Sequence, residues 1–113
     1  MTRIEKPWGF EELIFVGDRY AFKKLFMLQG HACSLQFHVD KHETIYVVEG
    51  LLQFEIGPSN NELVSHELRP GAFWIIEPGM IHRMSALVDT LYLEASTPEL
   101  SDVVRIEDLY GRA

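Results

Sequence analysis

The sequence has 113 residues, of which 47% are hydrophobic and 24% are charged. These shares are ordinary for a soluble globular protein and exclude a largely disordered chain. The formal net charge of -7 argues against nucleic acid or an anionic membrane as the main partner, because both require a basic surface. Cys33 is the only cysteine, so neither an intrachain disulfide nor a zinc cluster of thiolates can form.

The length predicts one domain over residues 1–113, with a tail at 98–113 that packs on the rest of the fold. No apolar stretch approaches the roughly 20 residues that a membrane-spanning helix needs. The first eight residues also lack the apolar core of a secretion signal. We therefore expect a cytoplasmic protein with a reduced thiol and no membrane partner.

Aromatic and β-branched residues recur in short runs separated by Gly, Pro, Asn and Asp, which is the pattern of consecutive β-strands. The predicted strands, in chain order, are 12–16, 20–28, 34–38, 43–48, 51–56, 63–68, 72–76, 81–85 and 90–95. Residues 49–50 are expected to form a hairpin-like turn, and the tail a short helix or an edge segment. Short strands with little room for a long helix indicate an all-β sandwich or barrel.

Strand alternation points to a metal site, because alternate residues face the same way. Gln36 and His38 share one face of the third predicted strand. The loop at 39–42 would bring both of them to the same interior end as Glu43, and His82 lies at the start of a later strand. Two imidazoles, a carboxylate and an amide oxygen suit a divalent ion such as zinc, manganese, iron or nickel. The alternative is a barrel with a polar but empty mouth.

Two segments resemble the two sequence motifs of the cupin family. The first covers residues 30–43 and closes at Gly50, and the second covers residues 71–82. In both, the spacing from the glycine to the final histidine agrees with the motif, although Gln36 stands where most cupins have their first histidine. The resemblance implies a single-domain cupin, that is, a double-stranded β-helix or jelly-roll barrel.

The resemblance narrows to the cupin module of type II mannose-6-phosphate isomerases. Four short motifs in the correct order carry it, at residues 6–9, 34–38, 78–83 and 104–112. That module also has a glutamine at the first ligand position, and in its family it often follows a sugar-nucleotide transferase domain. Two features differ here: Lys6 replaces the family's usual arginine, and the histidine-rich loop is reduced.

The resemblance implies a metal-dependent sugar-phosphate isomerase that converts mannose 6-phosphate to fructose 6-phosphate and forms a homodimer. Lys23 and Arg83 match basic residues of the family, so both are candidates to bind the phosphate. From the residues alone, Lys23 could equally be a lysine at the barrel edge with its ammonium group in water, and Arg83 half of an ion pair on the outer face. A sugar-binding or small-molecule-binding cupin without catalysis and an iron-dependent oxygenase are the alternative functions.

The remaining polar and aromatic residues carry weaker expectations. Trp8 is expected to close one end of the barrel, and Cys33 to be a small buried residue on the face opposite the ligands. Three histidines are expected to be structural or on the surface: His31, His42 and His66. Three carboxylates could each serve as a base, and the sequence does not choose among them: Glu49, Glu77 and Glu94.

Overall fold

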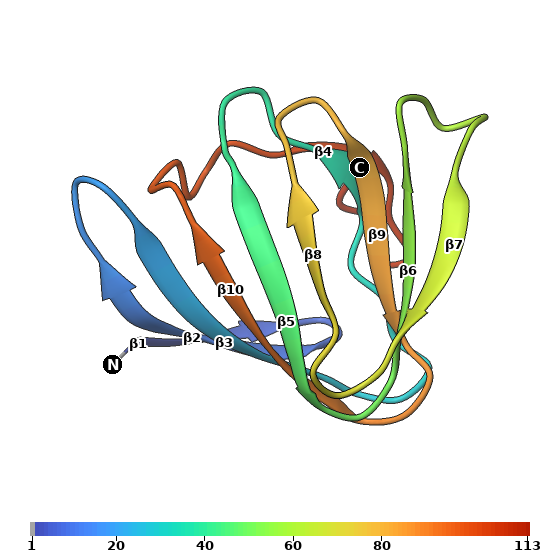
Figure 1. Ribbon diagram of the computed structural model, residues 1–113, viewed down its shortest axis with the longest axis horizontal. Helices are drawn as coiled ribbons and strands as arrows, with labels where there is room; N and C mark the ends of the chain where they lie inside the picture. The colour runs from blue at the N-terminus through green and yellow to red at the C-terminus, as the bar shows by residue number, and fades with distance from the viewer. Residues whose placement is uncertain (1) are drawn as a thin grey trace.

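The computed structural model describes residues 2–113, and the regular secondary structure of these residues consists of strands (Figure 1). The strands are β1 (Thr2–Lys6), β2 (Gly9–Val16), β3 (Ala21–Met27), β4 (Leu35–Phe37), β5 (Glu43–Glu49), β6 (Leu52–Gly57), β7 (Val64–Leu68), β8 (Phe73–Ile76), β9 (Ile81–Ala86), β10 (Thr90–Ser96) and β11 (Val104–Glu107). The predicted all-β class is confirmed. Within the described residues, no helix has the length and apolarity to cross a membrane.

The eleven strands of residues 2–113 form two antiparallel sheets. One sheet has the order β1-β2-β3-β10-β5-β8, and the other has the order β11-β4-β9-β6-β7. From β4 onward the chain passes repeatedly from one sheet to the other, so strands that follow each other in sequence mostly lie in different sheets (Figure 1). This alternation between two sheets is the topology of a double-stranded β-helix.

The sequence missed two features of this topology. The polar edge strand β1 pairs only with β2 and has no hydrophobic alternation that would reveal it. Residues 49–50 do not close a hairpin, because β5 and β6 belong to different sheets. Gly50 has a φ of 100°, and a Cβ atom there would lie 2.5 Å from the carbonyl oxygen of Asp89, so this crossing requires glycine. The tail takes the edge-segment form, as β11 beside β4.

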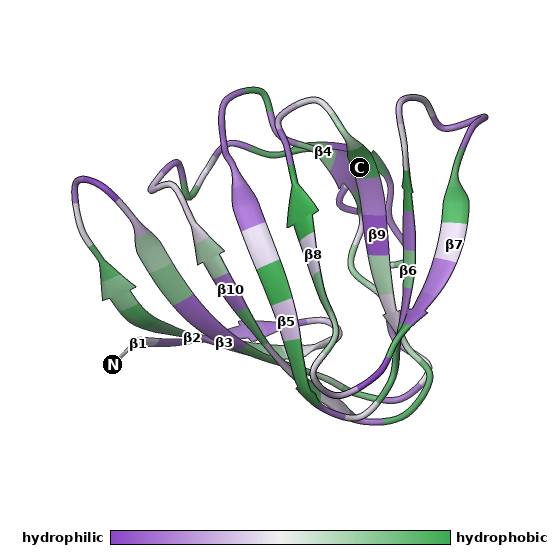
Figure 2. Ribbon diagram, viewed as in Figure 1, coloured by the Kyte–Doolittle hydropathy of each residue, from purple (hydrophilic) through white to green (hydrophobic). Residues whose placement is uncertain are grey.

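The inner faces of both sheets share one hydrophobic core. Ile45 and Tyr92 from one sheet and Phe54 and Met84 from the other belong to the same buried cluster. Several of the strands that supply this cluster also carry a polar residue farther along the same inner face, as Glu43 does in β5. Figure 2 shows these hydrophilic stretches near the starts of β5 and β9. The barrel interior is therefore apolar over most of its length and charged at one end.

Candidate metal centre and cavity

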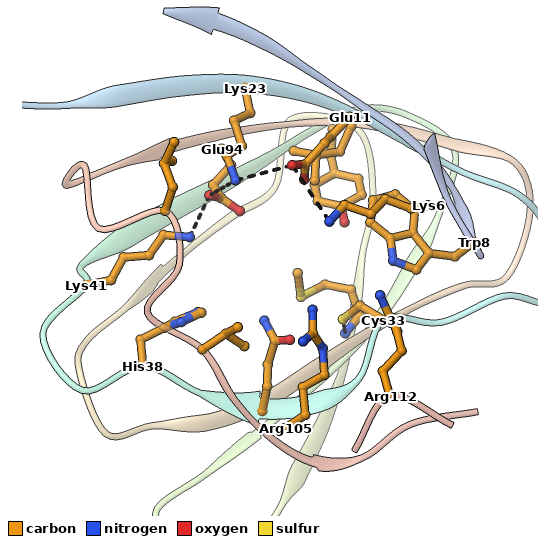
Figure 3. Close-up of a pocket in the computed structure, with 16 residues that line it drawn as sticks. Lys6, Trp8, Glu11, Lys23, Cys33, His38, Lys41, Glu94, Arg105 and Arg112 are labelled. Atoms are coloured by element: carbon orange, nitrogen blue, oxygen red, sulfur yellow. Dashed lines mark hydrogen bonds and ion pairs between the residues drawn. The ribbon is translucent and has the colours of Figure 1, made fainter. Parts of the chain in front are cut away.

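A cavity of about 110 Å³ lies at the charged end of the barrel interior (Figure 3). Residues of β2, β3 and β10 form one side of it, and residues of β4 and of the C-terminal segment (residues 98–113) form the other. Its charged lining residues are Lys6, Glu11, Lys23, Lys41, Glu94, Arg105 and Arg112. The cavity is thus a charged space above an apolar core, as expected of a site for a polar ligand.

Three of the four predicted metal ligands converge beside this cavity. Nε2 of His38 lies 3.3 Å from Oε2 of Glu43, and Nε2 of His82 lies 3.4 Å from Oε1 of the same carboxylate. The candidate ligand atoms lie within 4.8 Å of one another, and all three side chains are buried. Two atoms bound tetrahedrally to one zinc ion, each at about 2.1 Å, would be roughly 3.4 Å apart. The spacing therefore suits a single divalent ion.

The hydrogen bonds of the two imidazoles direct their free nitrogens at the carboxylate. Nδ1 of His38 contacts the carbonyl oxygen of Asp102, and Nδ1 of His82 lies 2.9 Å from that of Met80. A carbonyl oxygen only accepts, so Nδ1 carries the proton and the neutral ring offers a lone pair at Nε2. Both Nε2 atoms and Oε2 of Glu43 are buried without a hydrogen-bond partner. A shared cation would satisfy these facing acceptors, so the residues fit a metal ion.

Gln36, the fourth predicted ligand, lies next to this group. It pairs with His82 between β4 and β9, which puts both side chains on the same face. Gln36 lines the cavity, and its Oε1 atom accepts a hydrogen bond of 2.6 Å from the hydroxyl of Ser34. The structure thus gathers all four residues at one end of the barrel, with Gln36 on the cavity side.

The close packing of ionisable side chains in the site shifts their pKa values. Burial lowers the pKa of His38, but the adjacent carboxylate of Glu43 outweighs it, and the net pKa is raised. Burial acts to raise the pKa of Glu43, yet the nearby rings of His38 and His82 and the charge of Lys41 hold it well below its usual range. Burial and the nearby charge of Glu43 raise the pKa of Glu94. The two carboxylates therefore differ in proton affinity within one small site.

A chain of ion pairs lines one side of the cavity (Figure 3). Nζ of Lys41 lies 3.1 Å from Oε2 of Glu43 and 3.0 Å from Oε2 of Glu94. Lys23 lies between Glu94, at 3.9 Å, and Glu11, at 3.7 Å. Lys41 had no role in the sequence prediction, although it stands two residues before Glu43, the spacing at which alternate residues share a face. It links the candidate metal centre to the carboxylate in the cavity.

The two basic residues predicted to bind phosphate are in different places. Lys23 is buried and lines the cavity, with its charge balanced by two carboxylates. Arg83 is turned away from the cavity by the alternation of β9, in which His82 faces inward. Its guanidinium pairs with Glu55 at 3.2 Å and with Glu107 at 3.9 Å, which is the outer-face ion pair of the alternative interpretation.

Within the part of the chain that the structure describes, the unpaired cation of the cavity is instead Arg105, a residue of β11. Lys6, Lys23, Lys41 and Arg112 each have a carboxylate partner within 4.0 Å. Among residues 2–113, Arg105 forms no ion pair, and its Nε atom is buried without a hydrogen-bond partner. The sequence motif of the tail contained Arg105, but only the pairing of β11 with β4 places it opposite the lysines.

The other predicted residues divide between core, cavity and surface. Trp8 is buried in the core cluster and lines the cavity. Cys33 is buried as expected, but it lines the same cavity as Gln36 rather than the opposite face, because β4 starts only at Leu35. His31 bonds to the Tyr110 hydroxyl at 2.6 Å. Three of the remaining residues are exposed: His42, Glu49 and Glu77. The ring of His66 packs against that of Trp74 at a tilt of 40°.

Comparison with known proteins finds relatives that match almost the whole chain. No protein-family model matches the sequence. The chain is 32% identical over 114 residues to mannose-1-phosphate guanylyltransferase ManC of Salmonella typhimurium, covering 96% of this chain and 23% of that protein. It is 27% identical over 115 residues to xanthan biosynthesis protein XanB of Xanthomonas campestris, covering 97% and 24%. The chain thus spans about a quarter of the length of these relatives.

Solved structures share the fold. A Klebsiella pneumoniae protein with a double-stranded beta-helix domain superposes with a TM-score of 0.72 at 16% identity, covering 94% of this chain and 85% of that one. Together with the two-sheet topology, this shows that the chain has the double-stranded β-helix fold. The resemblance to the module of type II mannose-6-phosphate isomerases rests on the four sequence motifs, and the relatives that match almost the whole chain are a mannose-1-phosphate guanylyltransferase and a xanthan biosynthesis protein.

Proposed function

We propose that this cupin is a metal-dependent isomerase that interconverts the aldose and ketose forms of a phosphorylated sugar. The observation that carries the proposal is the convergence of His38, Glu43 and His82 through buried atoms that lack hydrogen-bond partners. The similarity to a mannose-1-phosphate guanylyltransferase supports a sugar phosphate as the substrate class. Mannose 6-phosphate is the first substrate to test.

His38, Glu43 and His82 would hold the ion, and Gln36 would complete the set from the cavity side. A bound divalent ion supplies Lewis acidity, which acidifies the carbon-bound hydrogen next to a carbonyl group and favours its removal. The buried hydrogen bonds from each Nδ1 to a carbonyl keep the two imidazoles oriented with Nε2 toward the ion.

Glu94 is the carboxylate best placed to move the proton. It is buried, lines the cavity and is joined to Glu43 through the ammonium group of Lys41. Its raised pKa suits a base that must also act as an acid. In the proposed reaction, Glu94 takes the proton from C2 of the sugar and returns it to C1, while the hydroxyl proton moves from O2 to O1. The isomerisation then needs no further reactant.

Arg105 is the proposed anchor of the phosphate group. Its guanidinium is unpaired, whereas the charge of Lys23 is balanced by Glu11 and Glu94. A guanidinium can form two parallel hydrogen bonds to a phosphate, which fixes the orientation of the sugar as well as its charge. We therefore propose that Arg105, rather than Lys23 or Arg83, binds the phosphate group. Lys23 would instead hold Glu94 in place through their ion pair.

The test measures metal content and turnover in the same preparations. Elemental analysis of the purified wild type is expected to find a divalent metal near one equivalent, and His82→Ala is expected to lose it while remaining folded by circular dichroism. The metal-loaded wild type is expected to convert mannose 6-phosphate to fructose 6-phosphate. A metal-loaded protein that binds hexose and pentose phosphates without turnover would instead establish the binding-module alternative. Equal metal content in the wild type and in His82→Ala would refute the assigned ligands.

A further inference from the structure

One residue of the C-terminal segment holds the whole loop that joins the ligand-bearing strands β4 and β5. Oδ1 of Asp102 accepts a hydrogen bond of 2.9 Å from the amide of Val39. Oδ2 accepts two more, of 2.7 Å from Asp40 and 2.9 Å from Lys41. The main-chain carbonyl of Asp102 accepts from Nδ1 of His38. Four consecutive residues are thus bound by one residue more than 60 positions away in the sequence.

These bonds act on groups that matter to the metal centre. The bond to His38 fixes which ring nitrogen is free, and the bonds to the loop fix the backbone from which Lys41 reaches Glu43. The same segment supplies Leu100, Val103 and Arg105 to the cavity lining. Docking of the segment therefore closes the cavity and orders the loop through the same residue.

Resting on the proposed metal-dependent function, we infer that Asp102 is a positioning residue that couples docking of the C-terminal segment to metal affinity. Its carboxylate caps three loop amides and its carbonyl orients His38, so the ligand set is preorganised only when the segment is docked. Because coupling is reciprocal, a bound metal ion must favour the docked segment to the same extent that the docked segment favours the ion.

The test compares Zn²⁺ affinity in the wild type, Asp102→Ala and Asp102→Asn, by competition with a chromophoric chelator. Asp102→Ala keeps the main-chain carbonyl that contacts His38 but removes the carboxylate that holds the loop amides. It is expected to lower Zn²⁺ affinity about 10-fold, the lower end of the loss typical when a group that orients metal ligands is removed. Asp102→Asn keeps one acceptor oxygen and is expected to be intermediate, so it also serves if the alanine variant does not fold. Glu99→Gln removes a charge from the same segment at an exposed side chain and is expected to bind like the wild type.

Two further readouts separate positioning from general stability. The visible spectrum of Co²⁺ reports ligand geometry, and it is expected to change in Asp102→Ala but not in Glu99→Gln. Zn²⁺ is expected to slow amide hydrogen exchange at Val104 and Arg105 in the wild type, and this slowing is expected to disappear in Asp102→Ala.

If Asp102→Ala binds Zn²⁺ as tightly as the wild type and its Co²⁺ spectrum is unchanged, the role of Asp102 is refuted. The proposed metal site is not affected by that result. A wild type that binds neither Zn²⁺ nor Co²⁺ would remove the proposed function and the inference together. The two failures are distinguishable because the second is visible in the unmodified protein.

Discussion

Replacing Lys41 with methionine tests whether the charge network around Glu43 and Glu94 is as buried as the structure indicates. The Lys41 ammonium lies 3.1 Å and 3.0 Å from the two carboxylates, and all three side chains are at most 7% exposed. Methionine keeps most of the length and removes only the charge. The variant therefore leaves two buried carboxylates without their shared cation.

The expected loss is about 3–5 kcal/mol of unfolding free energy, the usual cost of removing one partner from a buried ion pair. For a domain whose total stability is of the order of 5–15 kcal/mol, that corresponds to a fall in Tm of roughly 10–20 °C. Lys24→Met is the matched control, because Lys24 also pairs with a glutamate, Glu12, at 4.0 Å, but its side chain is 37% exposed. An exposed pair contributes at most about 1 kcal/mol.

The assay is urea unfolding of metal-free protein, followed by circular dichroism at pH 5 and pH 8. Burial already raises the pKa of Glu94, and loss of Lys41 raises it further. The folded variant then binds more protons than the unfolded chain above pH 4.5, so its stability falls as pH rises. Lys41→Met is therefore expected to lose more stability at pH 8 than at pH 5. Equal unfolding free energies for the two lysine variants, or a larger loss at pH 5, would refute the buried network.

Two other predictions concern the cavity. Arg105→Gln is expected to weaken binding of mannose 6-phosphate by calorimetry roughly 10- to 100-fold, the worth of one charge-assisted hydrogen bond, while Arg83→Gln on the outer face binds normally; equal losses would argue against Arg105 as the anchor. Burial raises the pKa of Cys33 to about 11, so at pH 8 a thiol reagent is expected to label it only after unfolding. Rapid labelling of the folded protein would show that the cavity opens to solvent more than the structure indicates.

The fold and the placement of the candidate metal ligands were predictable because both depend largely on local periodicity. Alternation placed Gln36 and His38 on one face, and the short loop fixed where Glu43 would follow. The parity argument for Cys33 was wrong because it extended a strand too far: β4 begins at Leu35, and the preceding residues make only an isolated bridge between Ala32 and Ser85. Alternation predicts direction only while the strand is regular.

The rest of the site depends on contacts between segments far apart in the sequence. Nothing near Asp102 indicates that its carboxylate caps a loop more than 60 residues earlier, and nothing near Arg105 indicates that β11 pairs with β4. The outer-face position of Arg83 was within reach of the sequence, since His82 was already assigned to the inside and neighbours on a strand point in opposite directions. The family resemblance instead favoured a phosphate-binding Arg83, which would have to face the cavity.

The charges of the cavity indicate what kind of ligand would complete it. A buried charge is costly unless it is paired, and the lysines, the two cavity glutamates and Arg112 all have partners. Among residues 2–113, two places remain open: the Nε2 acceptors of His38 and His82 beside the Glu43 carboxylate, which call for a cation, and Arg105, which calls for an anion. A metal ion alone would fill only the first, and a neutral sugar neither. A divalent ion together with a phosphorylated substrate fills both, which is why the metal site and the unpaired arginine support the same proposal independently.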